Sequence, residues 1–189
     1  MGEGASGRPV NAEAGKALKA AALQLVRANG YDNVSIAAIA KAAGVARQTL
    51  YNRWATKADL ILEAVFEETH NYAAEPDFDT DKDCRTLLET FLVNVFNHLE
   101  IDGDTLRALI AAAQHDSGFQ ASFHAGFVKP RERMITALLV RAQDTGELPS
   151  SRNPETISTL IHGAFWYRLL NRGALNPAFA REIVSNIFD

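Results

Sequence analysis

Residues 36–53, IAAIAKAAGVARQTLYNR, decide the fold of this chain. In this stretch Ala40 is followed four residues later by Gly44, and Leu50 comes six residues after Gly44. A small side chain such as that of Ala40 lets a second helix cross closely, and glycine supplies the positive φ that a tight turn requires. Val45 and Leu50 can then fill the wedge between the two helices. The spacing predicts a helix-turn-helix.

The second helix of this predicted motif has an outward face without acidic residues. If Leu50 points inward, a rotation of about 100° per residue directs Gln48 and Asn52 away from the core. Five side chains lie on or beside this outward face: Arg47, Gln48, Thr49, Tyr51 and Asn52. In the major groove of DNA, amides pair with adenine and a guanidinium pairs with guanine. We therefore favour a DNA-reading helix over the alternative, which is an ordinary solvated surface helix.

Charge is distributed unevenly along the 189 residues. The net charge of −4 argues, taken alone, against a nucleic-acid partner. Residues 1–57 nevertheless carry +5, whereas residues 58–189 carry −9. A basic segment followed by an acidic one is typical of a small DNA-reading head joined to an acidic body.

Two helix starts flank the motif. Ser35 can cap its first helix, and Thr56 with Asp59 resembles a capping box that starts a further helix. Lys57 lies in the first turn of that helix, where its charge opposes the helix dipole at a cost of roughly a few tenths of a kcal/mol. The placement is favourable if a DNA phosphate binds there, because helix N-terminus and ammonium both attract the anion. An incidental surface lysine is an equally weighted alternative.

Apolar residues recur at helical spacing along nearly the whole chain, and no stretch shows the alternation of a β-strand. We expect an all-α fold of about nine helices. They should span residues 13–29, 36–43, 46–54, 60–73, 83–99, 105–115, 119–145, 153–172 and 176–188. Pro130 should start a new turn or kink its helix, and Asn153 and Asn176, each followed by proline, should cap the last two helices.

The predicted organisation has three parts. Residues 1–12 form a flexible N-terminal arm, residues 13–56 form the helix-turn-helix domain, and residues 57–189 form a larger helical body for ligand binding and dimerisation.

Several classes of function are disfavoured. The single cysteine, Cys84, excludes an intramolecular disulfide and suits a reducing cytoplasm. No apolar run approaches the roughly 20 residues that cross a bilayer, and the first residues lack the apolar core of a secretory signal. No two histidines have the His-x-x-x-His spacing that a metal site on one helix would need, and the common catalytic motifs are missing. We expect a cytoplasmic protein without catalytic residues, metal, cofactor or membrane partner.

Residues 34–66, VSIAAIAKAAGVARQTLYNRWATKADLILEAVF, resemble the N-terminal domain of the TetR family of bacterial transcriptional regulators. The resemblance covers about residues 12–66 and rests on Ser35, the turn from Ala40 to Val45, residues 49–51, Trp54 and Lys57. It implies a three-helix DNA-binding head and a body whose last two helices form a dimeric four-helix bundle. It also implies that Ser35, Thr49, Tyr51 and Lys57 hold phosphates, whereas Ala46, Arg47, Gln48 and Asn52 meet bases. The base read by Gln48 is left open, because this position varies within the family.

The last two predicted helices carry more apolar surface than the body needs for its own core. The residues concerned are Ile157, Leu160, Ile161, Phe165, Phe179, Ile183 and Ile187. We expect them to form an isologous homodimer, which would place two recognition helices about 34 Å apart on a palindromic operator.

A ligand pocket is expected in the body, because few charges interrupt its apolar stripes. Phe119, Phe123 and Phe127 follow one helix face, for which core packing is the default interpretation and pocket lining the alternative. The candidate lining residues are Phe96, His98, Phe119, Phe123, His124, Phe127, His162 and Trp166. In the run from Phe165 to Tyr167, at least one ring should face a pocket or a partner subunit.

The sequence therefore predicts a sequence-specific transcriptional regulator associated with the bacterial nucleoid through DNA. We expect a repressor that is released from its operator by a small, largely apolar ligand of unknown identity. The alternative is a helical enzyme or a protein-docking adaptor whose helix-turn-helix is incidental.

Overall fold

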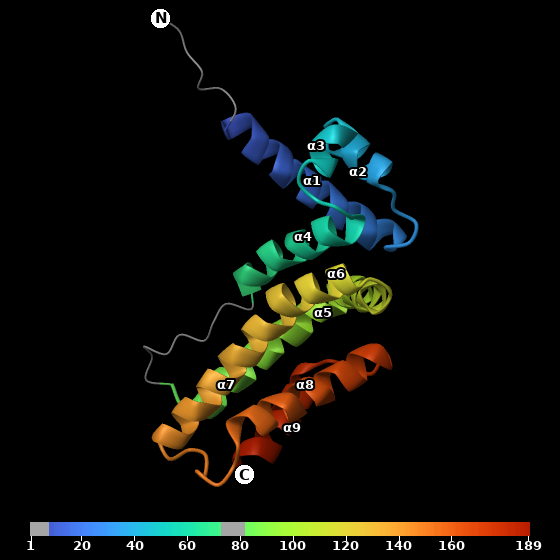
Figure 1. Cartoon of the computed structure of the whole chain (residues 1–189). Helices are drawn as coiled ribbons and strands as arrows, with labels where there is room; N and C mark the ends of the chain where they lie inside the picture. Colours follow the sequence, from blue (N-terminus) through green and yellow to red (C-terminus); the bar gives the residue numbers. More distant parts are fainter. Residues whose placement is uncertain (1–7, 73–81) are drawn as a thin grey trace, which may run out of the picture. The chain divides into compact units, whose positions relative to one another are not determined.

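The structure is a computed structural model that describes residues 8–72 and 82–189. Within these ranges it contains nine α-helices, one π-helical turn and no β-strand (Figure 1). The elements are α1 (Arg8–Asn29), α2 (Ile36–Ala42), α3 (Arg47–Tyr51), α4 (Lys57–Tyr72), α5 (Cys84–His115), α6 (Ser117–Phe123), the π turn η1 (His124–Val128), α7 (Lys129–Asp144), α8 (Pro154–Leu170) and α9 (Pro177–Phe188). The all-α prediction is confirmed. None of the described helices is both long enough and apolar enough to cross a membrane.

The chain divides into two compact units. The first unit comprises the chain up to Glu68 together with Asp104–Gln120, and the second comprises Thr69–Gly103 and Ala121–Asp189. The predicted body therefore contributes two segments to the first unit. Helix α1 begins at Arg8, so residues 8–12, assigned above to a flexible arm, are helical, and the rest of that arm lies outside the described residues.

Helices α1, α2 and α3 contact one another around a small apolar core in the first unit (Figure 1). Leu18, Ile39, Ala40 and Leu50 are almost fully buried there. Gly44 ends the α2 segment with φ of 67°, and the Val45 N–H donates to the Ala40 carbonyl at 3.0 Å. The predicted tight turn is therefore present, closed by a hydrogen bond across it.

Both predicted helix starts around the motif are confirmed. The Ser35 hydroxyl accepts a hydrogen bond from the Ala38 N–H at 3.1 Å. At the start of α4 the Asp59 N–H donates to the Thr56 hydroxyl at 3.1 Å, and the Asp59 carboxylate accepts from the Thr56 N–H at 2.9 Å. This is the reciprocal bonding of a capping box.

Helix α5 runs unbroken from Cys84 to His115, so the two helices predicted over residues 83–99 and 105–115 are wrong. The interval between the two predicted helices is a short, mostly polar run, residues 100–104, that contains Gly103. A single glycine costs a helix only about 1 kcal/mol, and that run holds no proline. Asp102 is buried in mid-helix, where its carboxylate meets His98 one turn earlier at 2.6 Å.

Pro130 lies in the first turn of α7, and the π turn precedes it directly. A proline ring clashes with the carbonyl four residues earlier in an α-helix and offers no N–H to it. The wider π turn accommodates this break without ending the helical run. The prediction of a new turn or kink at Pro130 is confirmed.

Helices α8 and α9 start as expected. The side-chain oxygens of Asn153 and Asn176 accept hydrogen bonds from the N–H groups of Thr156 and Phe179 at 2.8 and 2.9 Å. Helix α8 contacts both α7 and α9 within the second unit.

The end of α8 differs from the prediction. The helix stops at Leu170, and Arg172 rather than glycine adopts the left-handed φ of 56°. At Gly173 a Cβ would lie 3.3 Å from the Arg168 side chain, so a larger residue there would require this side chain to shift slightly.

Candidate nucleic-acid interface

Helix α3 presents the predicted outward face. Arg47, Gln48 and Asn52 are exposed and Tyr51 is 53% exposed, whereas Thr49 is half-buried. Leu50 is fully buried. One inward leucine therefore sets the rotation of this five-residue helix, and the polar side chains face solvent.

The two amides furthest from the core bond to each other. The Gln48 Nε2 donates to Asn52 Oδ1 at 2.9 Å. Asn52 also forms the C-cap of α3, where its backbone N–H bonds to the Gln48 carbonyl. The pair forms one polar unit on the exposed surface.

A shallow groove of about 360 Å³ lies between α2 and α3. Lys41 and Arg47 line it together with small apolar side chains, among them Ala37 and Val45. Sequence reasoning missed Lys41 as part of this surface, although the groove brings it beside Arg47 as a second cation. Ser35 and Ala46 are exposed at the starts of α2 and α3. The whole predicted DNA-contact set thus lies in the first unit.

The Lys57 side chain is held by hydrogen bonds within the protein and is not simply free to bind a phosphate. Its ammonium donates to the carbonyls of Tyr31 and Val34 at 2.7 and 2.9 Å and lies 4.0 Å from the centre of the Tyr31 ring. Burial lowers the pKa of Lys57 against the opposing pull of Asp32. Lys57 therefore fixes the loop before α2 to the start of α4, and one of its three N–H donors remains for an anion.

A charged network joins α1 to α4 through Trp54. The indole N–H of Trp54 donates to Glu63 Oε2 at 2.6 Å, and the Lys19 ammonium donates to Glu63 Oε1 at 3.0 Å. Lys19 also pairs with Glu67, and Arg27 pairs with Glu68 further along both helices. Partial burial pushes the pKa of Glu63 upward, but the bonds from Trp54 and Lys19 outweigh it and leave this pKa below its ordinary value.

The predicted pocket residues are distributed over both units. Phe119 is buried in the first unit, and Phe96, Phe123 and Phe127 are buried in the second. The rings of the second unit form a chain of contacts with centroid distances of 4.5–6.4 Å: Phe123 to Phe127, Phe127 to Trp166, Trp166 to Phe165, Phe165 to Phe96, and Phe96 to Phe179. The guanidinium of Arg131 lies over the Phe127 ring, next to the Phe123 end of this chain, and that of Arg168 lies over the Phe179 ring at the other end.

The three candidate histidines behave differently. His162 Nδ1 lies 2.7 Å from the Ser158 carbonyl of its own helix. His124 is exposed on the π turn, and its predicted contact with a ligand stays a prediction. His98 pairs with Asp102, which lies four residues later on α5.

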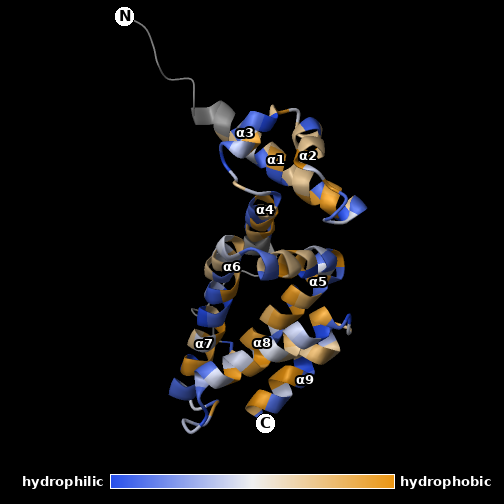
Figure 2. Cartoon of the chain, turned by 45° about the vertical axis from the view of Figure 1, so that its right-hand side comes forward, coloured by the Kyte–Doolittle hydropathy of each residue, from blue (hydrophilic) through white to orange (hydrophobic). Residues whose placement is uncertain are grey.

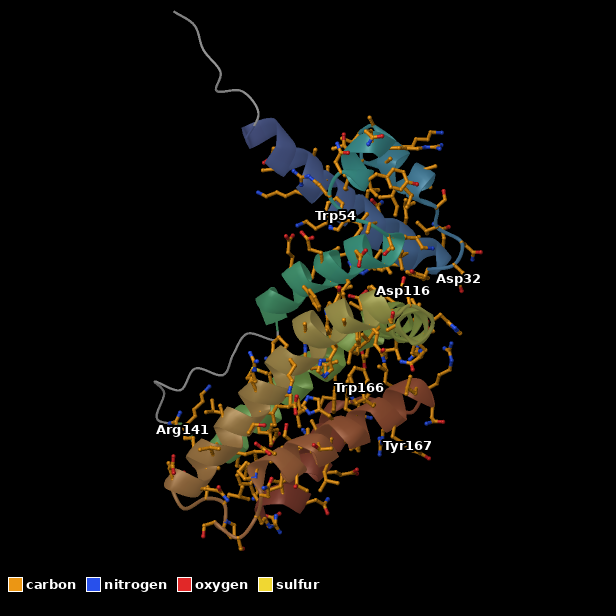
Figure 3. All side chains as sticks on the ribbon, in the orientation of Figure 1. Asp32, Trp54, Asp116, Arg141, Trp166 and Tyr167 are labelled. Atoms are coloured by element: carbon orange, nitrogen blue, oxygen red, sulfur yellow. The ribbon has the colours of Figure 1, made fainter. Side chains whose placement is uncertain are left out.

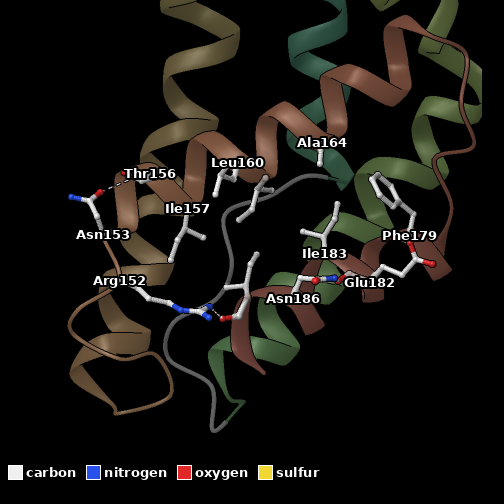
Figure 4. Close-up of a pocket in the computed structure, with 12 residues that line it drawn as sticks. Arg152, Asn153, Thr156, Ile157, Leu160, Ala164, Phe179, Glu182, Ile183 and Asn186 are labelled. Atoms are coloured by element: carbon white, nitrogen blue, oxygen red, sulfur yellow. Dashed lines mark hydrogen bonds between the residues drawn. The ribbon is translucent and has the colours of Figure 1, made fainter.

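All of the predicted dimer residues except Phe165 border a groove of about 640 Å³ between α8 and α9 (Figure 4). Ile157, Ile161, Ile183 and Ile187 line its floor, and Leu160 is 66% exposed beside them. Apolar residues continue along both helices (Figure 2).

The three consecutive rings on α8 point in different directions. Phe165 packs inward on Phe96 and Trp166 and does not line the α8–α9 groove. Tyr167 is 71% exposed and points away from Trp166, as Figure 3 shows. Tyr167 is thus the exposed ring of the run from Phe165 to Tyr167, and the half-exposed Leu170 is an additional surface candidate that sequence reasoning did not name.

The small helical unit with its exposed α3 and the second helical unit together define a helix-turn-helix transcriptional regulator. Residues 18–64 match the family described as bacterial regulatory proteins, tetR family, and residues 78–187 match the tetracyclin repressor-like C-terminal domain. The chain belongs to the TetR family, and it is a DNA-binding transcriptional regulator.

Individual relatives agree with this assignment. The chain is 30% identical to YdeS, an uncharacterised HTH-type transcriptional regulator of Bacillus subtilis, over 96% of this chain and 91% of that protein. It is 28% identical to the DNA-binding transcriptional repressor TetR of Mycobacteroides abscessus over 90% of each chain. The crystal structure of the TetR family transcription regulator SCO0332 superposes with a TM-score of 0.74 at 25% identity, covering 92% of this chain and 96% of that one. These relatives favour the DNA-binding prediction over an enzyme or adaptor.

Glu63→Gln should destabilise the first unit in a pH-dependent way. Because the folded pKa of Glu63 lies below its ordinary value of 4.5, the carboxylate stabilises the fold fully above that value and ceases to do so as pH falls through the folded pKa. The loss of unfolding free energy should be largest near neutral pH and shrink under acid. Urea titration of Trp54 fluorescence in a Trp166→Phe background measures it.

Glu13→Gln is the matched control, because Glu13 pairs with Lys16 at 3.9 Å with both side chains more than 70% exposed. Such pairs contribute little, so this variant should match the unchanged chain at every pH. A deficit of Glu63→Gln that is the same at neutral and acid pH would contradict the role of the carboxylate charge.

Proposed function

We propose that this regulator is a homodimeric repressor that binds a palindromic operator and leaves it when a small, largely apolar ligand binds the body. The observation that carries the DNA-binding part is the exposed face of α3, where amide, guanidinium and phenol groups are presented without an acidic residue. The repressor named among the relatives supports the direction of regulation.

The side chains proposed to contact DNA fall into two groups according to their chemistry. Arg47, Gln48 and Asn52, with the exposed Ala46 methyl, suit contact with base edges in the major groove. The hydroxyl groups of Ser35, Thr49 and Tyr51 and the remaining N–H of Lys57 suit phosphates, which position a protein without reading sequence. Lys41 joins the phosphate set through its groove with Arg47.

Gln48→Ala and Lys57→Ala should weaken DNA binding in distinguishable ways. Gln48→Ala should cost about 1–3 kcal/mol on the operator and little on random duplex. Lys57→Ala should weaken binding to every sequence and make the slope of log K against log salt shallower by about one. Fluorescence anisotropy over a salt series measures both.

Lys57→Ala also removes the bonds to Tyr31 and Val34. The DNA affinity of this variant should therefore be measured at a temperature well below its own melting temperature, where the variant is folded. Identical sequence and salt profiles for the two variants would contradict the division into reader and anchor.

The proposed dimer rests on the α8–α9 surface. The exposed Leu160 and the isoleucine side chains that line the neighbouring groove form an apolar surface that a second copy of the chain can cover. A two-fold axis there would give each subunit the same contact, and a pair of heads would then require two half-sites of inverted sequence.

Leu160→Glu should dissociate the dimer without unfolding the chain, because this side chain is 66% exposed and its replacement leaves no cavity. Light scattering at micromolar concentration should show a monomer, and operator affinity should fall because one head remains per complex. Ile101→Glu is the control: Ile101 is 67% exposed on α5 and should stay dimeric. A dimeric Leu160→Glu, or equal dissociation in both variants, would exclude this interface.

The proposed ligand site involves the aromatic chain of the second unit. A half-buried Trp166 joins the Phe127 and Phe165 rings, and the π turn that carries Phe127 is a type of element frequent at functional sites. Aromatic walls of this kind bind apolar or aromatic ligands.

The amphipathic dye anilinonaphthalene sulfonate, whose aromatic rings bind apolar surfaces, should therefore quench Trp166 in a Trp54→Phe variant and weaken operator binding. Tenfold weaker DNA binding requires about 1.4 kcal/mol of coupling, and by linkage the DNA must weaken dye binding equally. Phe127→Ala should change the dye affinity. Dye binding that leaves both Trp166 and the operator complex unaffected would contradict this site.

A further inference from the structure

We infer that the hydrogen bond from Gln48 to Asn52 restricts Gln48 to adenine, which makes Asn52 a positioning residue for base selection. This inference rests on the proposed DNA-binding role of α3 and names the base that its central amide reads. It is carried by the 2.9 Å bond between two exposed amides whose helix is fixed in rotation by the buried Leu50.

The bond removes one of the donors that Gln48 can offer. A glutamine amide has two N–H donors and one carbonyl oxygen. With Nε2 donating to Asn52 Oδ1, Gln48 keeps one N–H and Oε1. One donor beside one acceptor matches adenine, which presents the N7 acceptor and the N6 donor in the major groove.

Guanine requires a different set of partners. It presents two acceptors in the major groove, N7 and O6. An unbonded Gln48 can turn its NH₂ group toward both acceptors, whereas the bonded amide would place Oε1 against one of them. Gln48 can bind guanine with two donors only by giving up its bond to Asn52.

The free-energy cost of breaking the bond between Gln48 and Asn52 decides whether guanine is disfavoured. On a hydrated helix surface an amide pair at i, i+4 shifts populations only about twofold. In a DNA groove, however, the abandoned Asn52 Oδ1 faces partners from which water has been displaced, and an unpaired acceptor in such surroundings is costly. The adenine preference should therefore appear in the complex, at roughly tenfold over guanine.

The backbone supports this arrangement. Asn52 is held at the C-cap of α3 by N–H bonds to the Gln48 and Leu50 carbonyls, so its side chain starts from a fixed position one turn beyond Gln48. Asn52 Oδ1 accepts from Gln48, and its Nδ2 group can donate to an acceptor on a neighbouring base or phosphate in the proposed complex.

The test selects binding sites for the full chain from random duplexes. Comparison with Gln48→Ala identifies the operator position where sequence preference disappears. The ratio of adenine to guanine at that position is then measured for the unchanged chain, Asn52→Ala, Asn52→Asp and the control Asn29→Ala, whose amide lies exposed at the end of α1.

The unchanged chain and Asn29→Ala should prefer adenine by roughly tenfold, and Asn52→Ala should reduce that ratio below about threefold. Asn52→Asp retains an acceptor for Gln48, so it should keep the adenine preference while its new charge weakens binding to every sequence. An unchanged ratio in Asn52→Ala, or a guanine preference in the unchanged chain, overturns this inference alone. A chain that enriches no sequence overturns the proposed function and the inference with it.

Discussion

The close crossing of α2 and α3 is the constraint on which the DNA-facing surface depends. Ala40 is 1% exposed, and its carbonyl accepts the bond from Val45 that closes the turn. A larger side chain at this position would separate the helices, and a residue other than glycine at position 44 would strain the turn at its φ of 67°. Once the crossing is fixed, Leu50 has only one place to pack, and the directions of Gln48 and Asn52 follow.

The attachment of α4 to the three-helix unit combines contacts of unequal weight. Lys19, Glu67, Arg27 and Glu68 form ion pairs between partly exposed side chains, which contribute little individually. The bonds of Lys57 to two backbone carbonyls are stronger, because their loss would leave half-buried acceptors without partners. The orientation of α4 at its first turn is therefore set mainly by Lys57 and Trp54, while the ion pairs further along adjust it.

Structural features that depend on neighbouring residues were predictable from the sequence, whereas features that depend on packing between distant residues were not. The caps at Ser35, Asn153 and Asn176 need only residues within three positions, so they appear as expected. The break expected near Gly103 is absent, because helical packing on both sides outweighs the low propensity of one glycine. The partners of Lys57 lie 23 and 26 residues away, a separation at which no periodicity indicates contact. The outward direction of α3 was predictable, whereas the bond between its amides depends on rotamers that only the structure gives.

Helix α8 illustrates why apolar composition alone could not assign roles to its residues. It is apolar on several sides, so periodicity does not distinguish an inward face from an interface. The structure separates them: Phe165 lies against Phe96 in the interior, whereas Leu160 and Tyr167 are exposed. Phe165 also contacts Trp166, so the interior aromatic chain and the exposed face are carried by the same rigid helix. A displacement of Trp166 by a ligand would therefore move the exposed face of α8 as well. The proposed ligand site and the proposed dimer surface therefore share this helix.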